Sequence, residues 1–254
     1  MTVPDATAYE VAVCGMLTVP GSSLGVRLAA DALLVRARVF GVRAVFACRV
    51  HEAEHRRRLT AGLGAVRRLD WLDDLMTLPL EIPIPSNALT VRQQHVIRTL
   101  PAGCVDETVD GFVRRLTRPL TAEVAVVAGR NWRAGLVRAG TYGPYCARVL
   151  VLSGVPADLA DAQVQAGYYG VGLIVGTATT PRVAVAGEPF VPQAHSPAGW
   201  FFTEELYHQA LSVIGGESGP QPAAVAPRPP RSSAAQGEPG HRGGSPTGCT
   251  PRAS

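Results

Sequence analysis

The chain contains no lysine: all 24 basic residues among its 254 are arginine. This absence excludes mechanisms that need a lysine amine, such as Schiff-base formation, a P-loop lysine or the lysine of protein kinases. Because a guanidinium stays protonated, the arginines supply positive charge and hydrogen bonds but no proton-accepting group.

Long apolar runs are also absent. Runs such as residues 124–128 and 149–152 are far shorter than the roughly 20 residues of a membrane span. The N-terminal residues include Asp5 and Glu10 and lack the basic start of a secretory signal. The five cysteines stand far apart and form no C-x-x-C pair, which argues against a disulfide framework or a thiolate zinc site. We therefore expect a cytoplasmic protein that does not enter a membrane and that uses most cysteines as small core residues.

What is present is a chain apolar enough to bury a core, with 46% hydrophobic and 17% charged residues. From residue 217 to the end, proline, glycine, serine, alanine and arginine dominate and no aromatic residue occurs. Such a composition cannot offset the entropy of ordering, so residues 217–254 are predicted to be a disordered tail.

The periodicity before the tail predicts an α/β fold with a mixed sheet flanked by helices. We expect strands at residues 10–17, 30–39, 42–50, 123–128, 148–153 and 171–175. We expect helices at residues 90–100, 104–116, 132–141, 157–167 and 202–214, the last capped by Thr203. Residues 52–75 form one helix or two helices broken around Gly62–Gly64, and the alternate prolines of residues 78–85 predict an extended connector.

This pattern divides the chain into four parts. Residues 1–86 are an N-terminal α/β segment and residues 87–120 are a helical hairpin. Residues 121–216 are an α/β core, and residues 217–254 are the tail. A short glycine-containing turn in the second part makes a helix-turn-helix one interpretation; a hairpin that only packs a core is the other.

Four stretches of the third part resemble a known fold: residues 126–130, residues 132–136, residues 142–152 and residues 169–175. Their succession of strand, helix, strand and glycine-flanked strand resembles the restriction-endonuclease-like, or PD-(D/E)xK, family over about residues 123–176. The resemblance implies a nuclease-type mixed sheet flanked by helices.

The family's catalytic residues do not carry over. Its E-x-K motif falls on Ala128, Gly129 and Arg130. A second register, with Asp31 as the first acid, places Ala47, Cys48 and Arg49 at the motif and fails in the same way. Because these enzymes hold Mg²⁺ with two carboxylates and use a lysine beside the attacking water, the resemblance implies a nuclease fold without its active site.

Such a chain is expected to bind nucleic acid, or a protein partner, without catalysis and without a cofactor. Arginine forks match phosphate geometry, so we expect the contacts to come from two arginine clusters. The predicted nucleic-acid-binding residues are Arg114, Arg115, Arg118, Arg130, Arg133 and Arg138. For Arg114, Arg115 and Arg118, the alternative interpretation is that nearby carboxylates neutralise the charges on a solvated helix face.

A rival hypothesis comes from another motif. His51, Glu52 and His55 satisfy H-E-x-x-H, in which two histidines one helical turn apart bind Zn²⁺ and the glutamate activates water. The sequence then predicts a zinc-dependent hydrolase with catalytic Glu52, a third ligand among Asp70, Asp73 and Asp74, and Zn as cofactor. Against it, three arginines follow the motif directly, which would repel a dication. A purely structural adaptor is the third possibility.

Overall fold

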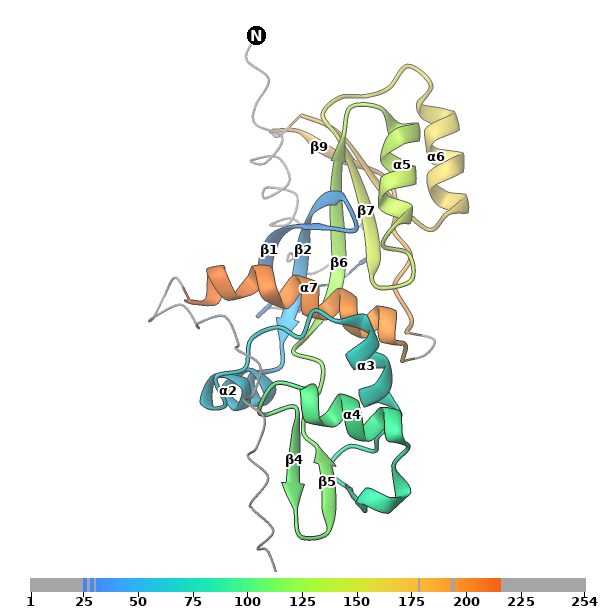
Figure 1. Ribbon diagram of the computed structural model, residues 1–254. Helices are drawn as coiled ribbons and strands as arrows, with labels where there is room; N and C mark the ends of the chain where they lie inside the picture. The colour runs from blue at the N-terminus through green and yellow to red at the C-terminus, as the bar shows by residue number, and fades with distance from the viewer. Residues whose placement is uncertain (1–24, 27, 30, 178, 193–194, 216–254) are drawn as a thin grey trace, which may run out of the picture.

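The computed structural model describes residues 25–26, 28–29, 31–177, 179–192 and 195–215. Its larger element is a six-stranded mixed sheet in the order β1-β2-β6-β7-β8-β9 (Figure 1). The strands are β1 (Leu33–Val39), β2 (Val42–Val50), β6 (Leu120–Gly129), β7 (Ala147–Leu152), β8 (Gly172–Gly176) and β9 (Pro181–Val185). The α/β class and the mixed sheet flanked by helices are therefore confirmed, whereas the strand expected at residues 10–17 and the tail lie outside the described residues.

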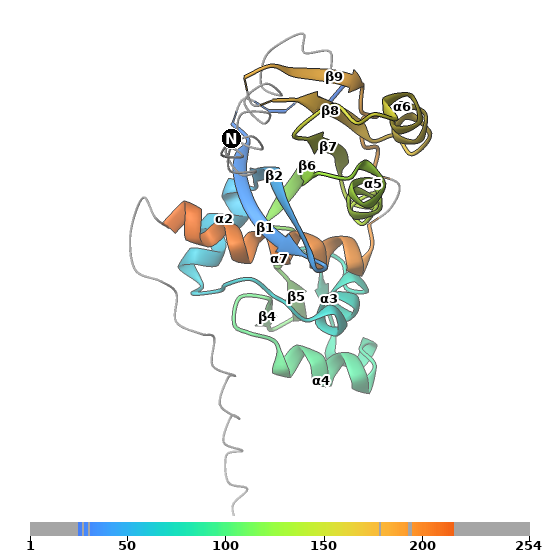
Figure 2. The ribbon, with the colours of Figure 1, turned by 90° about the horizontal axis from the view of Figure 1, so that it is seen from above.

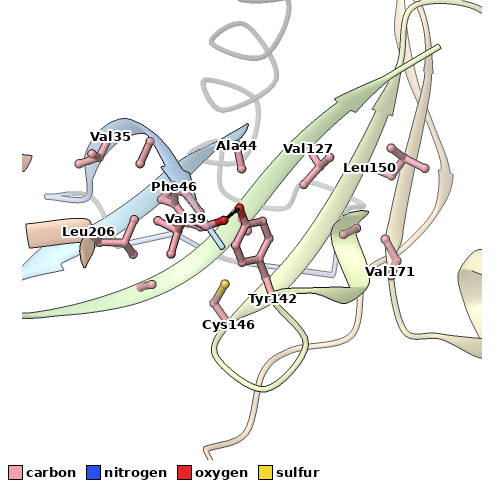
Figure 3. Packing of buried hydrophobic residues seen from close by; sticks show 14 of the residues in the cluster. Val35, Val39, Ala44, Phe46, Val127, Tyr142, Cys146, Leu150, Val171 and Leu206 are labelled. Carbon is pink, nitrogen blue, oxygen red and sulfur yellow. Dashed lines mark hydrogen bonds between the residues drawn. The ribbon is translucent and has the colours of Figure 1, made fainter. Parts of the chain in front are cut away.

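One half of this sheet is antiparallel. β1 and β2 are joined by a two-residue turn at Phe40 and Gly41, both with positive φ (50° and 78°), which suits the right-handed twist of a hairpin. The hydroxyl of Tyr142 donates to the carbonyl of Val39 (3.1 Å; Figure 3). It also donates to the carbonyl of Val42 (2.7 Å), so the turn is held against the rest of the core. β2 then pairs antiparallel with β6.

The other half is parallel and matches the predicted alternation. β6, β7 and β8 run parallel, connected by α5 (Trp132–Gly140) and α6 (Leu159–Tyr168). Asn131 caps α5 by accepting a hydrogen bond from the Ala134 amide (3.1 Å). These strands are buried on both faces, as their continuous apolar runs require, so the sheet has a hydrophobic cluster on each side.

Helix α7 (Pro197–Ile214) crosses the antiparallel half and separates the large sheet from a smaller part of the protein. Figure 1 places it between the sheet and the part that contains α2 (Glu52–Thr60), α3 (Leu69–Met76) and α4 (Val91–Thr99), and Figure 2 also shows α3 and α4 on the side of α7 away from the sheet. The split of residues 52–75 into two helices and the helix expected at residues 90–100 are thus confirmed. A short 3-10 helix, η1 (Ser86–Ala88), and a three-stranded sheet complete this part; its strands, in spatial order, are β3 (Pro83–Ile84), β5 (Gly111–Arg114) and β4 (Val105–Thr108).

The helix predicted at residues 104–116 is wrong. The chain forms the antiparallel hairpin β4–β5, and Gly111 at its turn has φ 126°. A Cβ at Gly111 would lie 2.1 Å from the carbonyl oxygen of Ile84, so only glycine fits there. Asp110-Gly111 is a hairpin signal that outweighs the valine spacing, and a helix-turn-helix is therefore not formed by residues 87–120.

The start of the last helix also differs from the prediction. α7 begins at Pro197, and the hydroxyl of Ser196 caps it by accepting from the Gly199 amide (3.0 Å). A serine followed by proline at the first helical position is a stronger start signal than Thr203. Thr203 instead lies inside the helix, where its hydroxyl donates to the carbonyl of Trp200 (2.7 Å).

The two parts of the molecule meet at Arg58, which is fully buried. Its guanidinium donates two hydrogen bonds to Glu204 (2.7 and 2.8 Å), one to Glu54 (2.7 Å) and one each to the carbonyls of Thr117 (2.8 Å) and Gly64 (3.3 Å). This one cation thereby connects α2 and α7 with the two chain segments that contain Gly64 and Thr117. Burial alone would lower the pKa of Arg58, but the two carboxylates outweigh it and raise the pKa.

Glu204 is as buried as Arg58, and both of its carboxylate oxygens accept hydrogen bonds. Besides Arg58, it accepts hydrogen bonds from the Val66 amide (2.8 Å) and the Trp200 indole (3.0 Å). The Tyr207 ring lies 5.1 Å from the Arg58 guanidinium and covers it from the side. With every strong donor and acceptor satisfied, this pair meets the condition under which a buried ion pair is tolerated.

Replacing Glu204 with glutamine should therefore destabilise the protein strongly. The substitution leaves Arg58 buried beside a neutral amide, and breaking a buried pair in this way costs about 3–5 kcal/mol. Urea unfolding followed by circular dichroism measures the loss. The matched control is Asp70→Asn, which removes the partner of Arg68 in an exposed pair and should leave the urea midpoint nearly unchanged. Equal effects of the two variants would contradict the role given to Arg58.

Candidate anion-binding pocket

The six predicted nucleic-acid-binding arginines do not form one site. Arg118 stands just before β6 and Arg130 just after it, and a strand of ten residues is roughly 30 Å long. The set Arg130, Arg133 and Arg138 therefore lies at one end of the strand, while Arg114, Arg115 and Arg118 lie at the other.

At the carboxyl end of β6, the charges are partly neutralised. Arg133 donates to Asp158 (2.8 Å) and lies 4.1 Å from the Trp132 ring. Arg138 donates to the carbonyls of Ala128 (3.0 Å) and Ala134 (3.4 Å). Arg130 is exposed on the surface. This end of the sheet therefore presents scattered positive charge without a pocket formed by the three arginines.

At the amino end of β6, Arg115 has different partners from Arg114 and Arg118. It pairs with Asp106 (2.8 Å) on the adjacent strand β4 and with Glu81. A helix would have placed Arg114, Arg115 and Arg118 close to one face. Instead, Arg114 is the last residue of β5 and Arg115 follows the strand, and the two side chains reach different partners. Arg115 is thus neutralised by two carboxylates and is not part of the site described next.

Arg114 and Arg118 meet in a pocket of about 430 Å³. Four of its lining residues are basic types and none is acidic; the lining is His51, Met76, Arg114, Thr117, Arg118, His195 and Trp200. It is smaller than the groove of about 670 Å³ between α5 and α6, whose lining includes Val137 and Val164. The smaller pocket is the candidate site because both of its charged lining residues are arginine, whereas Asp161 lines the larger groove.

Arg114 is held in place but is not neutralised. One terminal nitrogen donates to the carbonyl of Leu75 (2.8 Å) near the end of α3, and the guanidinium lies 5.6 Å from the Trp200 ring. Its Nε is buried and has no hydrogen-bond partner in the described part of the chain. Burial lowers the pKa of Arg114, as expected for a cation that pays for desolvation without a carboxylate beside it.

Arg118 is likewise half-buried without a carboxylate partner in the described residues. Its guanidinium makes a long contact of 3.5 Å with the carbonyl of Ser196, the capping residue of α7, and burial lowers its pKa as well. No carboxylate pairs with Arg114 or Arg118 among the residues that the structure describes. Since the amino end of α7 adds a partial positive charge, the pocket carries unbalanced positive charge.

The nearest carboxylates are occupied elsewhere. Glu54 accepts a long bond from the Thr117 amide (3.4 Å), but its main partners are Arg57 and Arg58. Burial would raise the pKa of Glu54, and hydrogen bonds from these two arginines outweigh it and lower the pKa. Glu204 is committed to Arg58. The buried network thus removes the acids that would otherwise balance the pocket.

The H-E-x-x-H residues occupy three different environments. His51 is the residue just before α2, and its side chain does not cap the helix. Its Nδ1 donates to the carbonyl of Arg118 (2.8 Å), and its Nε2 is hydrogen-bonded to the Thr121 hydroxyl (2.9 Å). His55 is buried with Nδ1 on the Tyr207 hydroxyl (2.8 Å), and Glu52 is exposed. Binding a metal through His51 would require breaking one of its two hydrogen bonds. No group of three or more potential metal ligands occurs within the described residues.

The two motif registers of the resemblance can also be located. Ala128 and Gly129 end β6, and Arg130 follows it. In the second register, Arg49 lies 3.7 Å from Glu123, and Glu123 also accepts from the Ala29 amide (2.9 Å). Glu123, the carboxylate beside Arg49 of the second register, is therefore held by a protein cation and a backbone amide.

The sequence gives no signal for the pocket as a whole. Arg114, Arg118 and His51 are singled out by it, but for two separate hypotheses, and Trp200 and His195 follow some 80 residues later. A scan of protein-family models and searches of curated proteins and of solved structures find no match to this chain. Within the described part, no helix has the length and apolar character needed to cross a membrane.

We predict that the protein purified without a chelator contains much less than one zinc per chain. Both ring nitrogens of His51 are engaged, and Arg56 to Arg58 place positive charge next to the motif. Metal content by atomic emission, with His55→Ala measured in parallel, tests this. One tightly bound zinc per chain that disappears in the variant would favour the hydrolase instead.

Proposed function

We propose that this protein binds nucleic acid without cleaving it and that Arg114 and Arg118 contact its phosphates. The observation that carries the proposal is a pocket with two half-buried guanidiniums and, among the residues that the structure describes, no carboxylate in its lining. A guanidinium fork offers two parallel N–H donors to phosphate oxygens, so a phosphate would neutralise charge that the protein leaves unbalanced. A net charge of +4 favours the approach of a polyanion.

The succession of elements supports a nuclease-like origin for this function. A central strand, β6, is followed by α5, the parallel strand β7, α6 and β8, in the order that the resemblance to restriction endonucleases implies. At the positions of its catalytic motif stand Ala128 and Arg130, which offer no carboxylate and no lysine. We therefore propose a restriction-endonuclease-like fold that keeps binding and has lost catalysis.

Binding should depend on salt through the two pocket arginines. Each phosphate contact contributes about 0.7 to the slope of log affinity against log salt for single strands. Arg114→Gln combined with Arg118→Gln should therefore reduce the slope by about 1.4 and weaken binding most at low salt. Fluorescence anisotropy with a labelled single-stranded oligonucleotide, from 50 to 300 mM NaCl, measures it.

The matched control removes two charges at the other end of β6. Arg130→Gln combined with Arg133→Gln has the same net charge as the pocket variant but leaves the pocket intact. It should lose less affinity and retain more of the slope. The assignment to the pocket is wrong if the control loses as much as the pocket variant, and absence of any binding at low salt contradicts nucleic-acid recognition altogether.

We predict no cleavage of plasmid DNA in Mg²⁺ or Mn²⁺. Alanine at position 128 cannot ligate a metal, and arginine at position 130 cannot accept a proton from water. The assay follows conversion of supercoiled plasmid to nicked and linear forms over hours. Nicking that is abolished by Glu123→Ala, and not by Asp110→Ala on the exposed β4–β5 turn, would show that Glu123 supplies an active site after all.

A further inference from the structure

The charge of the pocket matches a dianion better than a monoanion. Arg114 and Arg118 contribute two positive charges, and no acidic residue of the described ranges lines the pocket. An internal phosphodiester carries one negative charge, which would leave one guanidinium unbalanced. A phosphomonoester carries about −1.5 to −2 at neutral pH and offers three strong acceptor oxygens.

The donors around the pocket come from several directions. Arg114 approaches from the end of β5, and Arg118 from the segment before β6. The amino end of α7 and the imidazole of His195 border the pocket from a third segment. Three terminal oxygens pointing in different directions can each find a donor in such an arrangement, whereas a diester presents only two and continues as chain on both sides.

The pocket also has room for more than the phosphate. Its volume of about 430 Å³ lies within the range of small-ligand sites, about 300–1,000 Å³. Met76 and Trp200 supply apolar surface beside the arginines. A sugar attached to the phosphate would find contacts there, and the strand would leave the pocket in one direction only.

We infer that this pocket receives the terminal phosphomonoester of a nucleic-acid strand, so that the protein distinguishes phosphorylated ends from hydroxyl ends. The inference rests on the proposed nucleic-acid binding and names the part of the polymer that the pocket recognises. The recognised chemistry is the dianionic phosphate, and it can be carried by a 5′ end or by a 3′ end.

The test uses the full chain and four single-stranded oligonucleotides of one sequence. They carry a 5′-phosphate, a 3′-phosphate, no terminal phosphate, or a 5′-phosphate capped by a methyl ester. The fluorescent label is attached at the end opposite to the one being compared, and the hydroxyl form is labelled to match. We expect one of the two phosphorylated oligonucleotides to bind about tenfold more tightly than the hydroxyl form. If the preferred end is 5′, the methyl ester should lose most of that gain; a 3′ preference is checked with the 3′-methyl ester.

Two variants test whether the preference for the phosphorylated end arises in the pocket. Arg118→Gln should abolish the preference for the phosphorylated end, whereas Arg130→Gln should retain it. Arg118 serves as the principal variant because its side chain makes only a long contact with Ser196, whereas Arg114 also binds the end of α3. Thermal unfolding of both variants checks that each is folded, and Arg118→Lys, which keeps the charge, should restore part of the preference.

The outcomes separate this inference from the proposed function. Equal affinity for all four oligonucleotides, with a normal salt slope that falls in the pocket variant, overturns terminal recognition and leaves nucleic-acid binding standing. A preference that survives Arg118→Gln also overturns it. No binding of any oligonucleotide overturns both.

Discussion

The buried contact between Arg58 and Glu204 is the constraint on which the rest of the structure depends. The two residues are 146 positions apart, both are fully buried, and the carboxylate also holds a backbone amide and the Trp200 indole. An unpaired charge at this depth would be expensive, so α2 and α7 have to meet in one relative position. That position brings the small three-stranded sheet against the amino end of α7 and thereby creates the walls of the pocket.

The same contact sets the electrostatics of the pocket. Glu54 and Glu204 lie near it but are neutralised by Arg57 and Arg58, and Arg115 takes up Asp106 and Glu81 on the other side of the hairpin. Arg114 and Arg118 are left half-buried with no carboxylate partner in the described residues. Whether an arginine is available for a ligand thus follows from where the acids are used and not from how many arginines stand together in the sequence.

Local patterns predicted the parallel half of the sheet well. β6, α5, β7, α6 and β8 were each expected from apolar runs, caps and glycines within a few residues of their observed bounds, because their burial on both faces leaves a strong local signature. Residues 104–116 were expected as a helix, because Val105, Val109, Phe112 and Leu116 recur at spacings that suit one. In short strands with only one packed face, the turn residues Asp110 and Gly111 decide the structure, and their signal is confined to two positions.

The sequence by itself determined the absence of lysine chemistry, the α/β class and the lack of carboxylates at residues 128–130, since these follow from residue identity and short-range periodicity. Only the tertiary structure decided which charges remain available. Arg114 and Arg115 are neighbours in the chain but have different partners: Arg114, the last residue of β5, lies against Trp200, whereas Arg115, which follows the strand, pairs with Asp106. An ion pair forms only between atoms that lie within about 4 Å of each other. Arg58 and Glu204 are far apart in the sequence, so no local sequence pattern shows that they meet.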